Sequence, residues 1–360
     1  MTMAQVMILF YISSNRLKDQ HGLTLLEMLV VVFILSAIAL MTLSFTNNAD
    51  DQFRFEDTRT RLEKIRTAIA GEPDRTINGG PAVSGFVVDI GRLPNNNALW
   101  ELLQPHSDPT ISCGGVGALP CWSFDSAVGL WAGWRGPYLT PLIEQGGTRT
   151  YRDGGGNPGV ISNNYGWKTF SATDTNADTL NDKLEVASFG SDGDSVAPED
   201  SYARDYPDAS SDLSADDLVV QDAHQINLKG WQVTVNFFNP PSGAASLPAV
   251  ATTLRIRLYY PQNGSFNYPI SWPPPTPDNQ PYLSMTQTLA AGEVLDNTSV
   301  SKTFSFGATD KFVPWGIRAL ALINDSDGTI FVSAMNKTKI VTLAPRTQLA
   351  PITDMEWRLE

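Results

Sequence analysis

The sequence is poor in the side chains on which most enzymes depend. Its 360 residues include only three histidines and two cysteines. His21 lies close to the N-terminus, and neither His106 nor His224 stands near a serine or cysteine motif that would make a nucleophile–base pair. The glycine run at 154–156 is not followed by the Lys and Ser or Thr of a phosphate-binding loop. We therefore expect no enzymatic activity.

Basic residues are also scarce. The chain has 25 Lys and Arg against 38 Asp and Glu, a formal net charge of −13. The sequence has no basic patch that could neutralise a phosphate backbone, which argues against nucleic acid as a direct partner. The acidic balance is compatible with cation binding and with solubility outside the cytoplasm. The length of the chain predicts two soluble modules rather than one small one.

One long apolar run stands near the N-terminus. No residue from Met28 to Phe45 carries a charge, which in a helix is enough for most of a membrane crossing. We predict a transmembrane helix over residues 23–45. A single acid, Glu27, lies at the start of the run, where an uncompensated carboxylate is costly and therefore a functional candidate. Cleavage just before Leu23 would place a new amino group one helical turn from Glu27.

The residues around Glu27 resemble the processing site of type IV pilins and type II secretion pseudopilins. That family has a polar leader ending in Gly, an apolar first mature residue, Thr or Ser second and Glu fifth. Gly22, Leu23, Thr24 and Glu27 take these places, with Leu where Phe is more usual. The resemblance implies a leader over residues 1–22, cleavage between Gly22 and Leu23, and N-methylation of Leu23, both by a prepilin peptidase.

Two other kinds of segment share part of this pattern. A secretory signal peptide has a shorter apolar core and a small-x-small cleavage site, which Ala37-Ile-Ala39 imitates. An ordinary single-pass anchor is the other alternative. The pilin-like interpretation is favoured because the apolar run continues past Ala39 and Glu27 interrupts its start.

The helical pattern continues beyond the apolar run. Apolar residues recur at helical spacing at Phe55, Leu62, Ile65 and Ile69. Gly71 and Pro73 end the pattern. We predict one helix over residues 23–70, with its second half packed on a soluble domain.

Residues 71–205 are rich in loops and are predicted to form a pilin headpiece. From about residue 130 they resemble the major type II secretion pseudopilin, which has roughly Trp-Gly-x-Pro-Tyr, Asp-x-Trp-Gly-Asn-Pro and Ser-x-Gly-Ala-Asp-Gly in this order. Here the segments are Gly133-Trp-Arg-Gly-Pro-Tyr-Leu139, Asp153-Gly-Gly-Gly-Asn-Pro158 and Val186-Ala-Ser-Phe-Gly-Ser-Asp192-Gly. Gly155 stands where the family usually has Trp. The resemblance implies a small antiparallel sheet and a calcium-binding loop at the last segment.

Two acidic clusters in this region are candidate calcium sites. The first has the oxygen spacing of an EF-hand loop, without its turn glycine, at Asp174, Asn176, Asp178, Asp182 and Glu185. The second is the pseudopilin-like loop with Asp192, Asp194, Glu199 and Asp200. The alternative for both is a solvated acidic loop built from Asx-turns.

The two cysteines, Cys113 and Cys121, flank a glycine-rich segment. Outside the cytoplasm, so close a pair is expected to form a disulfide that closes a tight loop. A metal pair is disfavoured because no third ligand of Cys or His type lies nearby.

The last part of the chain changes to short strands. Residues 206–228 are polar and acidic, which predicts a linker. Residues 229–345 contain six or seven short strands, which predicts a β-sandwich of immunoglobulin or transthyretin-like type, and residues 346–360 follow as a tail. The proline-rich run at 272–277 is predicted to be a rigid loop, with a polyproline face for a partner as the alternative.

These features predict an α+β protein in which a long N-terminal helix packs on an antiparallel headpiece, followed by an all-β domain. The predicted function is that of a pseudopilin or minor pilin, assembled through Thr24 and Glu27 with other pilin subunits, an inner-membrane platform and membrane lipid. We expect it in the inner membrane, with its soluble part in the periplasm or on the cell surface. The alternative is a membrane-anchored adhesin or binding protein that uses the helix only as an anchor.

Overall fold

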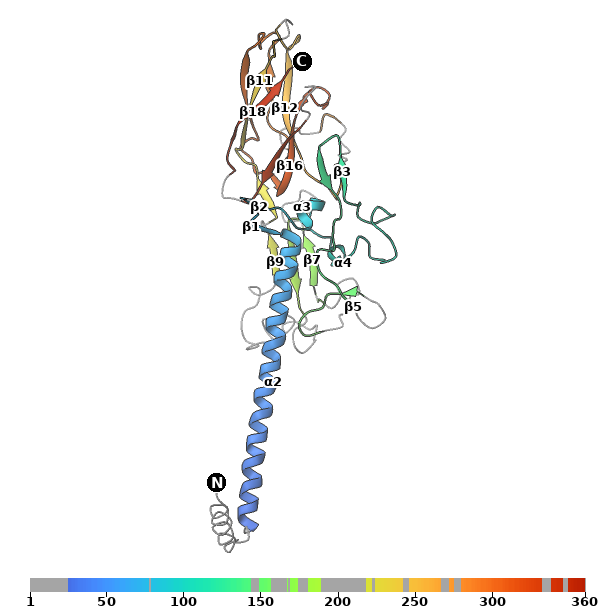
Figure 1. Cartoon of the computed structure of the whole chain (residues 1–360), viewed down its shortest axis with the longest axis vertical. Helices are drawn as coiled ribbons and strands as arrows, with labels where there is room; N and C mark the ends of the chain where they lie inside the picture. The colour runs from blue at the N-terminus through green and yellow to red at the C-terminus, as the bar shows by residue number, and fades with distance from the viewer. Residues whose placement is uncertain are drawn as a thin grey trace, which may run out of the picture. The chain divides into compact units, whose positions relative to one another are not determined.

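The protein was analysed as a computed structural model. The residues it describes are 25–77, 79–143, 149–156, 167, 169–173, 181–188, 218–221, 224–241, 246–266, 272–274, 280–331, 338–345 and 349–359. The chain divides into two compact units, Met1–Phe53 and Arg54–Glu360. Figure 1 shows the elements in chain order.

A single helix, α2 (Leu25–Ala70), follows the predicted bounds over its described length. Its end agrees with the sequence, because Gly71 adopts a left-handed φ of 72° that suits a helix C-terminus. Within the described ranges, no helix combines the length and the apolar character that a membrane crossing requires. The transmembrane helix over residues 23–45 therefore stays a prediction.

The last turns of α2 pack on the headpiece. Leu62, Ile65 and Ile69 are buried in one hydrophobic cluster, and Phe55 packs against its edge. The cluster also contains side chains from two short helices, α3 (Phe86–Ile90) and α4 (Trp100–Leu103). The apolar stripe read from the sequence is thus the buried face of this helix.

The headpiece contains a small antiparallel sheet, as predicted. Its strands are β7 (Thr169–Thr173), β8 (Lys183–Ala187) and β9 (Leu218–Gln221), in the order β7-β8-β9. The described part of the headpiece also contains three two-stranded sheets. They pair β1 (Glu72–Ile77) with β2 (Gly80–Ala82), β3 (Ser123–Asp125) with β4 (Leu130–Ala132), and β5 (Leu142–Ile143) with β6 (Arg149–Thr150).

The C-terminal part is all-β. Its first sheet has the order β14-β11-β18, with β14 (Ser299–Ser305), β11 (Gln232–Phe238) and β18 (Ile352–Arg358). Its second has the order β13-β12-β16-β17, with β13 (Gln287–Leu289), β12 (Thr252–Tyr259), β16 (Gly316–Asn324) and β17 (Lys339–Leu343). The short strands β10 (Gln225–Asn227) and β15 (Phe312–Pro314) form a separate antiparallel pair. Buried side chains of both larger sheets belong to one hydrophobic core.

The structure corrects two predicted boundaries. Residues 206–228, predicted to be a linker, include β9 and β10, because the apolar run Leu218–Val220 completes the headpiece sheet. Residues 346–360, predicted to be a tail, include β18, which pairs in parallel with β11. Met355, Trp357 and Leu359 of this segment are buried in the core.

The headpiece and the C-terminal β region belong to the same unit. The Trp315 indole donates a hydrogen bond to the Ala70 carbonyl at 2.9 Å, which satisfies one of the carbonyls that a helix leaves free at its C-terminus. The buried Arg318 guanidinium donates to the Val88 carbonyl of α3 at 3.3 Å. The end of α2 is therefore held by the β region as well as by the headpiece.

Candidate functional site

The predicted processing residues Gly22, Leu23 and Thr24 lie outside the described residues. Glu27 is described, in the first turn of α2, and is exposed. A carboxylate in the first turn is favoured by the partial positive charge at the N-terminus of a helix.

An exposed apolar surface follows Glu27. Thirteen large apolar side chains between Leu25 and Met41 have between 46% and 84% of their surface exposed. Because most of them are consecutive, they cover every face of the helix rather than one stripe. The hydroxyl of Ser36 donates to the Val32 carbonyl at 2.7 Å, so this polar group is satisfied within the helix. The surface is therefore suited to an apolar environment supplied from outside the chain.

A comparison with known families finds a match in the same stretch. A family model described as the prokaryotic N-terminal methylation motif matches residues 17–43. The chain carries the cleavage and methylation signal of type IV pilins and pseudopilins. The match includes Gly22, Leu23, Thr24 and Glu27, which confirms the resemblance drawn from those four residues. No curated protein and no solved structure was found to match the chain.

Two of the segments that resemble a pseudopilin meet in the headpiece. Asp153, which is buried, accepts a hydrogen bond of 2.6 Å from the hydroxyl of Ser188. The backbone N–H of Gly154 donates to the Thr58 hydroxyl on α2 at 2.9 Å. A Cβ at position 154 would lie 2.2 Å from the Arg54 carbonyl oxygen, so only glycine permits this approach. These motif residues attach the headpiece to α2.

The remaining segment that resembles a pseudopilin, Gly133–Leu139, contacts the buried carboxylate of Asp89. Arg135 pairs with Asp89 at 3.1 Å, and the Tyr138 hydroxyl donates to the same carboxylate at 3.0 Å. Burial raises the pKa of Asp89 from 3.8 to about 6, although Arg135, Tyr138 and Arg318 act in the opposite direction. Burial and the nearby carboxylate of Asp89 raise the pKa of Tyr138. The segment Trp134–Tyr138 is thereby fixed to α3.

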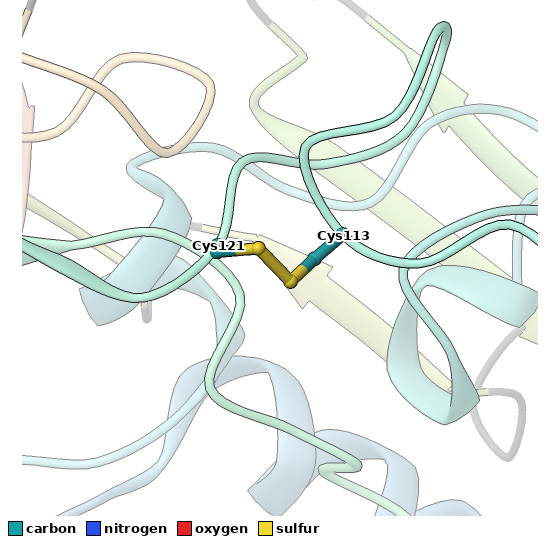
Figure 2. The surroundings of a disulfide bond; sticks show 2 residues. All are labelled: Cys113 and Cys121. Carbon is teal, nitrogen blue, oxygen red and sulfur yellow. A yellow bond between two sulfur atoms is a disulfide. The ribbon is translucent and has the colours of Figure 1, made fainter.

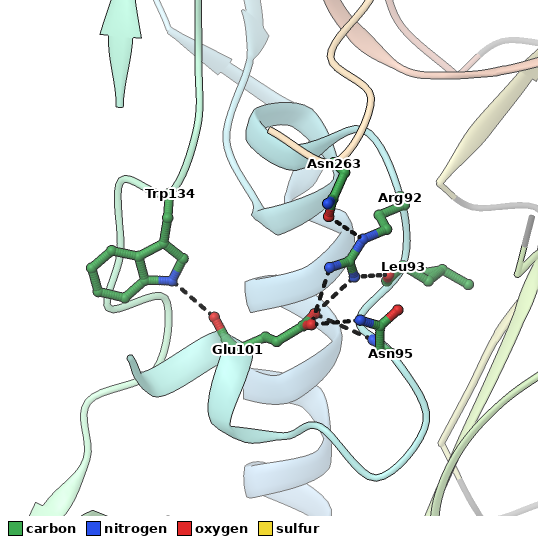
Figure 3. Close-up of polar contacts among 6 residues, drawn as sticks. All are labelled: Arg92, Leu93, Asn95, Glu101, Trp134 and Asn263. Atoms are coloured by element: carbon green, nitrogen blue, oxygen red, sulfur yellow. Dashed lines mark hydrogen bonds and ion pairs between the residues drawn. The ribbon is translucent and has the colours of Figure 1, made fainter. Parts of the chain in front are cut away.

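A second buried acid, Glu101, organises the loop before α4 (Figure 3). Arg92 donates two hydrogen bonds to its carboxylate, at 2.8 Å and 3.0 Å, and the Asn95 amide donates another at 2.9 Å. Arg92 also donates to Asn263 of the β region at 2.9 Å. The Trp134 indole donates to the Glu101 carbonyl at 2.9 Å. The sequence held no signal for this network, because its members come from three separate segments.

The predicted disulfide is present. Cys113 and Cys121 are bonded, with a Cα–Cα distance of 4.9 Å (Figure 2). Within the loop, the backbone N–H of Gly114 donates to the Leu119 carbonyl at 2.8 Å. The bond closes a tight loop directly before the β3–β4 hairpin.

The calcium predictions fall largely outside the described residues. This holds for Asp174, Asn176, Asp178, Asp192, Asp194, Glu199 and Asp200. Asp182 and Glu185 are described. Burial alternates along β8, so Asp182 lies on the buried side with Leu184, whereas Glu185 lies on the other side and pairs with Lys183 at 2.6 Å. The calcium sites therefore stay a prediction, because most of their candidate ligands lie outside the described residues.

The burial of His224 was not predicted from the sequence. His224 is only 1% exposed, and neither ring nitrogen has a hydrogen-bond partner among the described residues. Burial lowers the pKa of His224 from 6.5 to about 4, while the carboxylate of Asp182 acts in the opposite direction. The imidazole is therefore neutral near pH 7, and no described residue forms the hydrogen bond that would orient it as a general base.

Proposed function

We propose that this chain is a membrane-anchored structural subunit of a type IV pilin-like filament, either a pilus or a type II secretion pseudopilus. The signal at residues 17–43 is the observation that carries the proposal. A prepilin peptidase would cleave after Gly22 and methylate the new amino group of Leu23. The mature protein would lie in the inner membrane with its soluble part in the periplasm or on the cell surface.

The exposed apolar surface of α2 supports the anchoring role. Complete burial of a large apolar side chain contributes about 1.5–3 kcal/mol. Even with partial coverage by the helix itself, thirteen such side chains amount to a driving force on the order of 10 kcal/mol for transfer out of water. Lipid would cover this surface before assembly, and the helices of neighbouring subunits would cover it afterwards.

Glu27 is proposed to act in assembly rather than in processing. After cleavage, its carboxylate would pair with the Leu23 amino group of a neighbouring subunit, next to Thr24. In an apolar environment such a pair is strongly favoured over either charge alone, so it would set the axial register between subunits.

The C-terminal β region would form an integral part of the subunit. We infer that its two sheets make a β-sandwich, because they share one core. The hydrogen bond from Trp315 to Ala70 joins this region to the end of α2. An assembled filament would therefore display the β region at a fixed position relative to each headpiece.

Replacing Glu27 by alanine tests the proposal. We expect Glu27→Ala to be cleaved normally, as seen by gel mobility, and to be depleted from the sheared filament fraction on immunoblots. Glu56→Ala is the matched control, since Glu56 is an exposed glutamate on the same helix. Normal assembly of both variants would support the alternative, a surface binding protein that uses the helix only as an anchor.

We also propose that calcium stabilises the headpiece through the acidic loop with Asp192, Asp194, Glu199 and Asp200. The motivation is the clustering of like charges, which repel one another unless a cation is bound. A ligand that binds only the native state raises the melting temperature. Melting of the full chain in calcium and in chelator should differ, and Asp192→Ala should remove the difference while Asp178→Ala retains it. Identical melting of the wild type in both would refute the proposal.

A further inference from the structure

The β3–β4 hairpin has one face buried against the C-terminal β region. Val128, Leu130 and Ala132 are buried in a cluster with Tyr259 of β12 and Ala319 and Ala321 of β16. The Thr338 hydroxyl donates to the Val128 carbonyl at 2.9 Å, which adds a polar attachment. The small alanine side chains allow the hairpin to lie close to the sheet. These contacts hold the hairpin in place through this one face.

The other face carries a row of aromatic rings. Phe124 and Trp131 are directly paired across the strands and are 51% and 53% exposed. Their ring centroids are 5.5 Å apart, and the Trp131 ring lies 6.0 Å from the nearly parallel ring of Trp122. The Arg135 guanidinium lies 5.1 Å from the Trp122 ring. We call Trp122, Phe124 and Trp131 the aromatic platform.

The platform is fixed before any ligand arrives. Cys121, which precedes Trp122, is held by the disulfide, and the backbone N–H of Trp134 donates to the Pro120 carbonyl at 2.7 Å. Arg135 is held by its ion pair with the buried Asp89. The backbone that carries the platform would therefore need little ordering on binding.

The side chains and the charge around the platform indicate which class of ligand it could bind. Gly129 and Gly133, two positions on either side of Trp131, have no side chains, so no aliphatic group accompanies the rings on this strand. Protein interfaces also contain aromatic residues, but there surrounding side chains exclude water from them, which the glycines on either side of Trp131 do not do. Aromatic ring faces carry negative partial charge and attract the polarised C–H groups of a sugar ring. Arg135, whose guanidinium lies beside the Trp122 ring, is already paired with Asp89. The whole chain carries −13, which disfavours an anionic ligand.

We propose that the aromatic platform is a binding site for a neutral saccharide, which would stack on Trp131 and Phe124. The three rings lie next to one another, and contiguous exposed apolar patches, unlike scattered residues, mark interaction sites. The site does not depend on the assembly role proposed above, since a monomer would present it as well.

Affinity electrophoresis of the full chain in detergent tests this site. Native gels would contain hydroxyethyl cellulose, glycogen, galactomannan or laminarin, and the retarding polymer would then be titrated. We expect at least one to retard the wild type, and Trp131→Ala to weaken binding at least tenfold. Trp131→Phe, which retains a ring, should bind within threefold of the wild type. Ile340→Ala is the control, because Ile340 is a 61% exposed apolar residue of β17 outside the platform.

Three results would overturn the proposal. The first is a wild type that no neutral polymer retards, and the second is unchanged retardation of Trp131→Ala. The third is sugar-independent self-association that Trp131→Ala abolishes in sedimentation, which would assign the platform to a second copy of this chain. Thermal melting of each variant checks its folding. If Trp131→Ala does not fold, Phe124→Ala provides the same comparison.

Discussion

His224 offers the sharpest test of the packing in the Arg54–Glu360 unit. Its pKa falls from 6.5 to about 4 on folding because burial disfavours the imidazolium. A histidine with a depressed folded-state pKa contributes stability that is complete above pH 6.5 and is lost as the pH falls toward 4. A shift of this size corresponds to about 3 kcal/mol across that interval.

Replacing His224 by phenylalanine should remove this loss. At pH 7 we expect the free energy of unfolding of His224→Phe to equal that of the wild type or to exceed it by roughly 1–3 kcal/mol, since the change also removes two buried ring nitrogens that lack hydrogen-bond partners among the described residues. Toward pH 4 its advantage should grow by about 3 kcal/mol. Thermal melting of the full chain in detergent, followed by tryptophan fluorescence between pH 4 and 8, measures the difference.

The control is His106→Phe, because His106 is only partly buried and its ring nitrogen accepts a hydrogen bond from the backbone N–H of Asp108. This variant should not reproduce the growing advantage at low pH. A difference between His224→Phe and wild type that stays constant from pH 4 to 7 would refute the argument, because it would mean that His224 is not a buried neutral imidazole.

Three further predictions concern the same unit. Asp89→Asn should show the opposite pH dependence. Because the folded-state pKa of Asp89 is about 6, the wild type loses stability as the pH rises from 4 to 6, and the variant should gain about 2–3 kcal/mol relative to it over this interval. A stability difference that does not change with pH would contradict this prediction. Trp315→Phe removes the indole that donates to the Ala70 carbonyl and should cost about 1–3 kcal/mol in urea unfolding; no measurable cost would show that the bond does not hold the end of α2. Replacing both Cys113 and Cys121 by serine opens a loop with a sequence separation of 8 and should lower the free energy of unfolding by about 2–3 kcal/mol. Reducing the disulfide of the wild type should give the same loss, and a different loss would contradict this prediction.

Features with a local signal in the sequence were predictable. The stripe Leu62, Ile65 and Ile69 is the buried face of α2, and Gly71 ends that helix. The processing signal is confirmed because it depends on four residues within a short segment. The disulfide followed from the short separation of the only two cysteines.

Features that depend on distant partners were not predictable. Glu101 is stabilised by Arg92 and, through it, contacts Asn263, and nothing in the sequence connects these positions. His224 has no motif around it, and burial is the main cause of its lowered pKa.

The missed strand β18 has a more specific cause. In its pairing with β11, Ile352 lies opposite Val233 and Met355 lies opposite Val235. Three steps along β18 therefore correspond to two steps along β11, which is a register shift. This irregularity breaks the strict alternation by which a half-buried strand is recognised. Strand β9 was missed because its short apolar run, Leu218–Val220, follows an acidic stretch that resembled a linker.

The most direct test of the central claim is the N-terminus of the mature protein. Intact mass and N-terminal sequencing of the chain from the membrane fraction should give N-methylated Leu23 as the first residue. Gly22→Leu should leave the leader attached. A mature terminus between Leu40 and Asn47 would instead indicate a secretory signal peptide, and together with normal cleavage of Gly22→Leu it would contradict a pilin-type subunit.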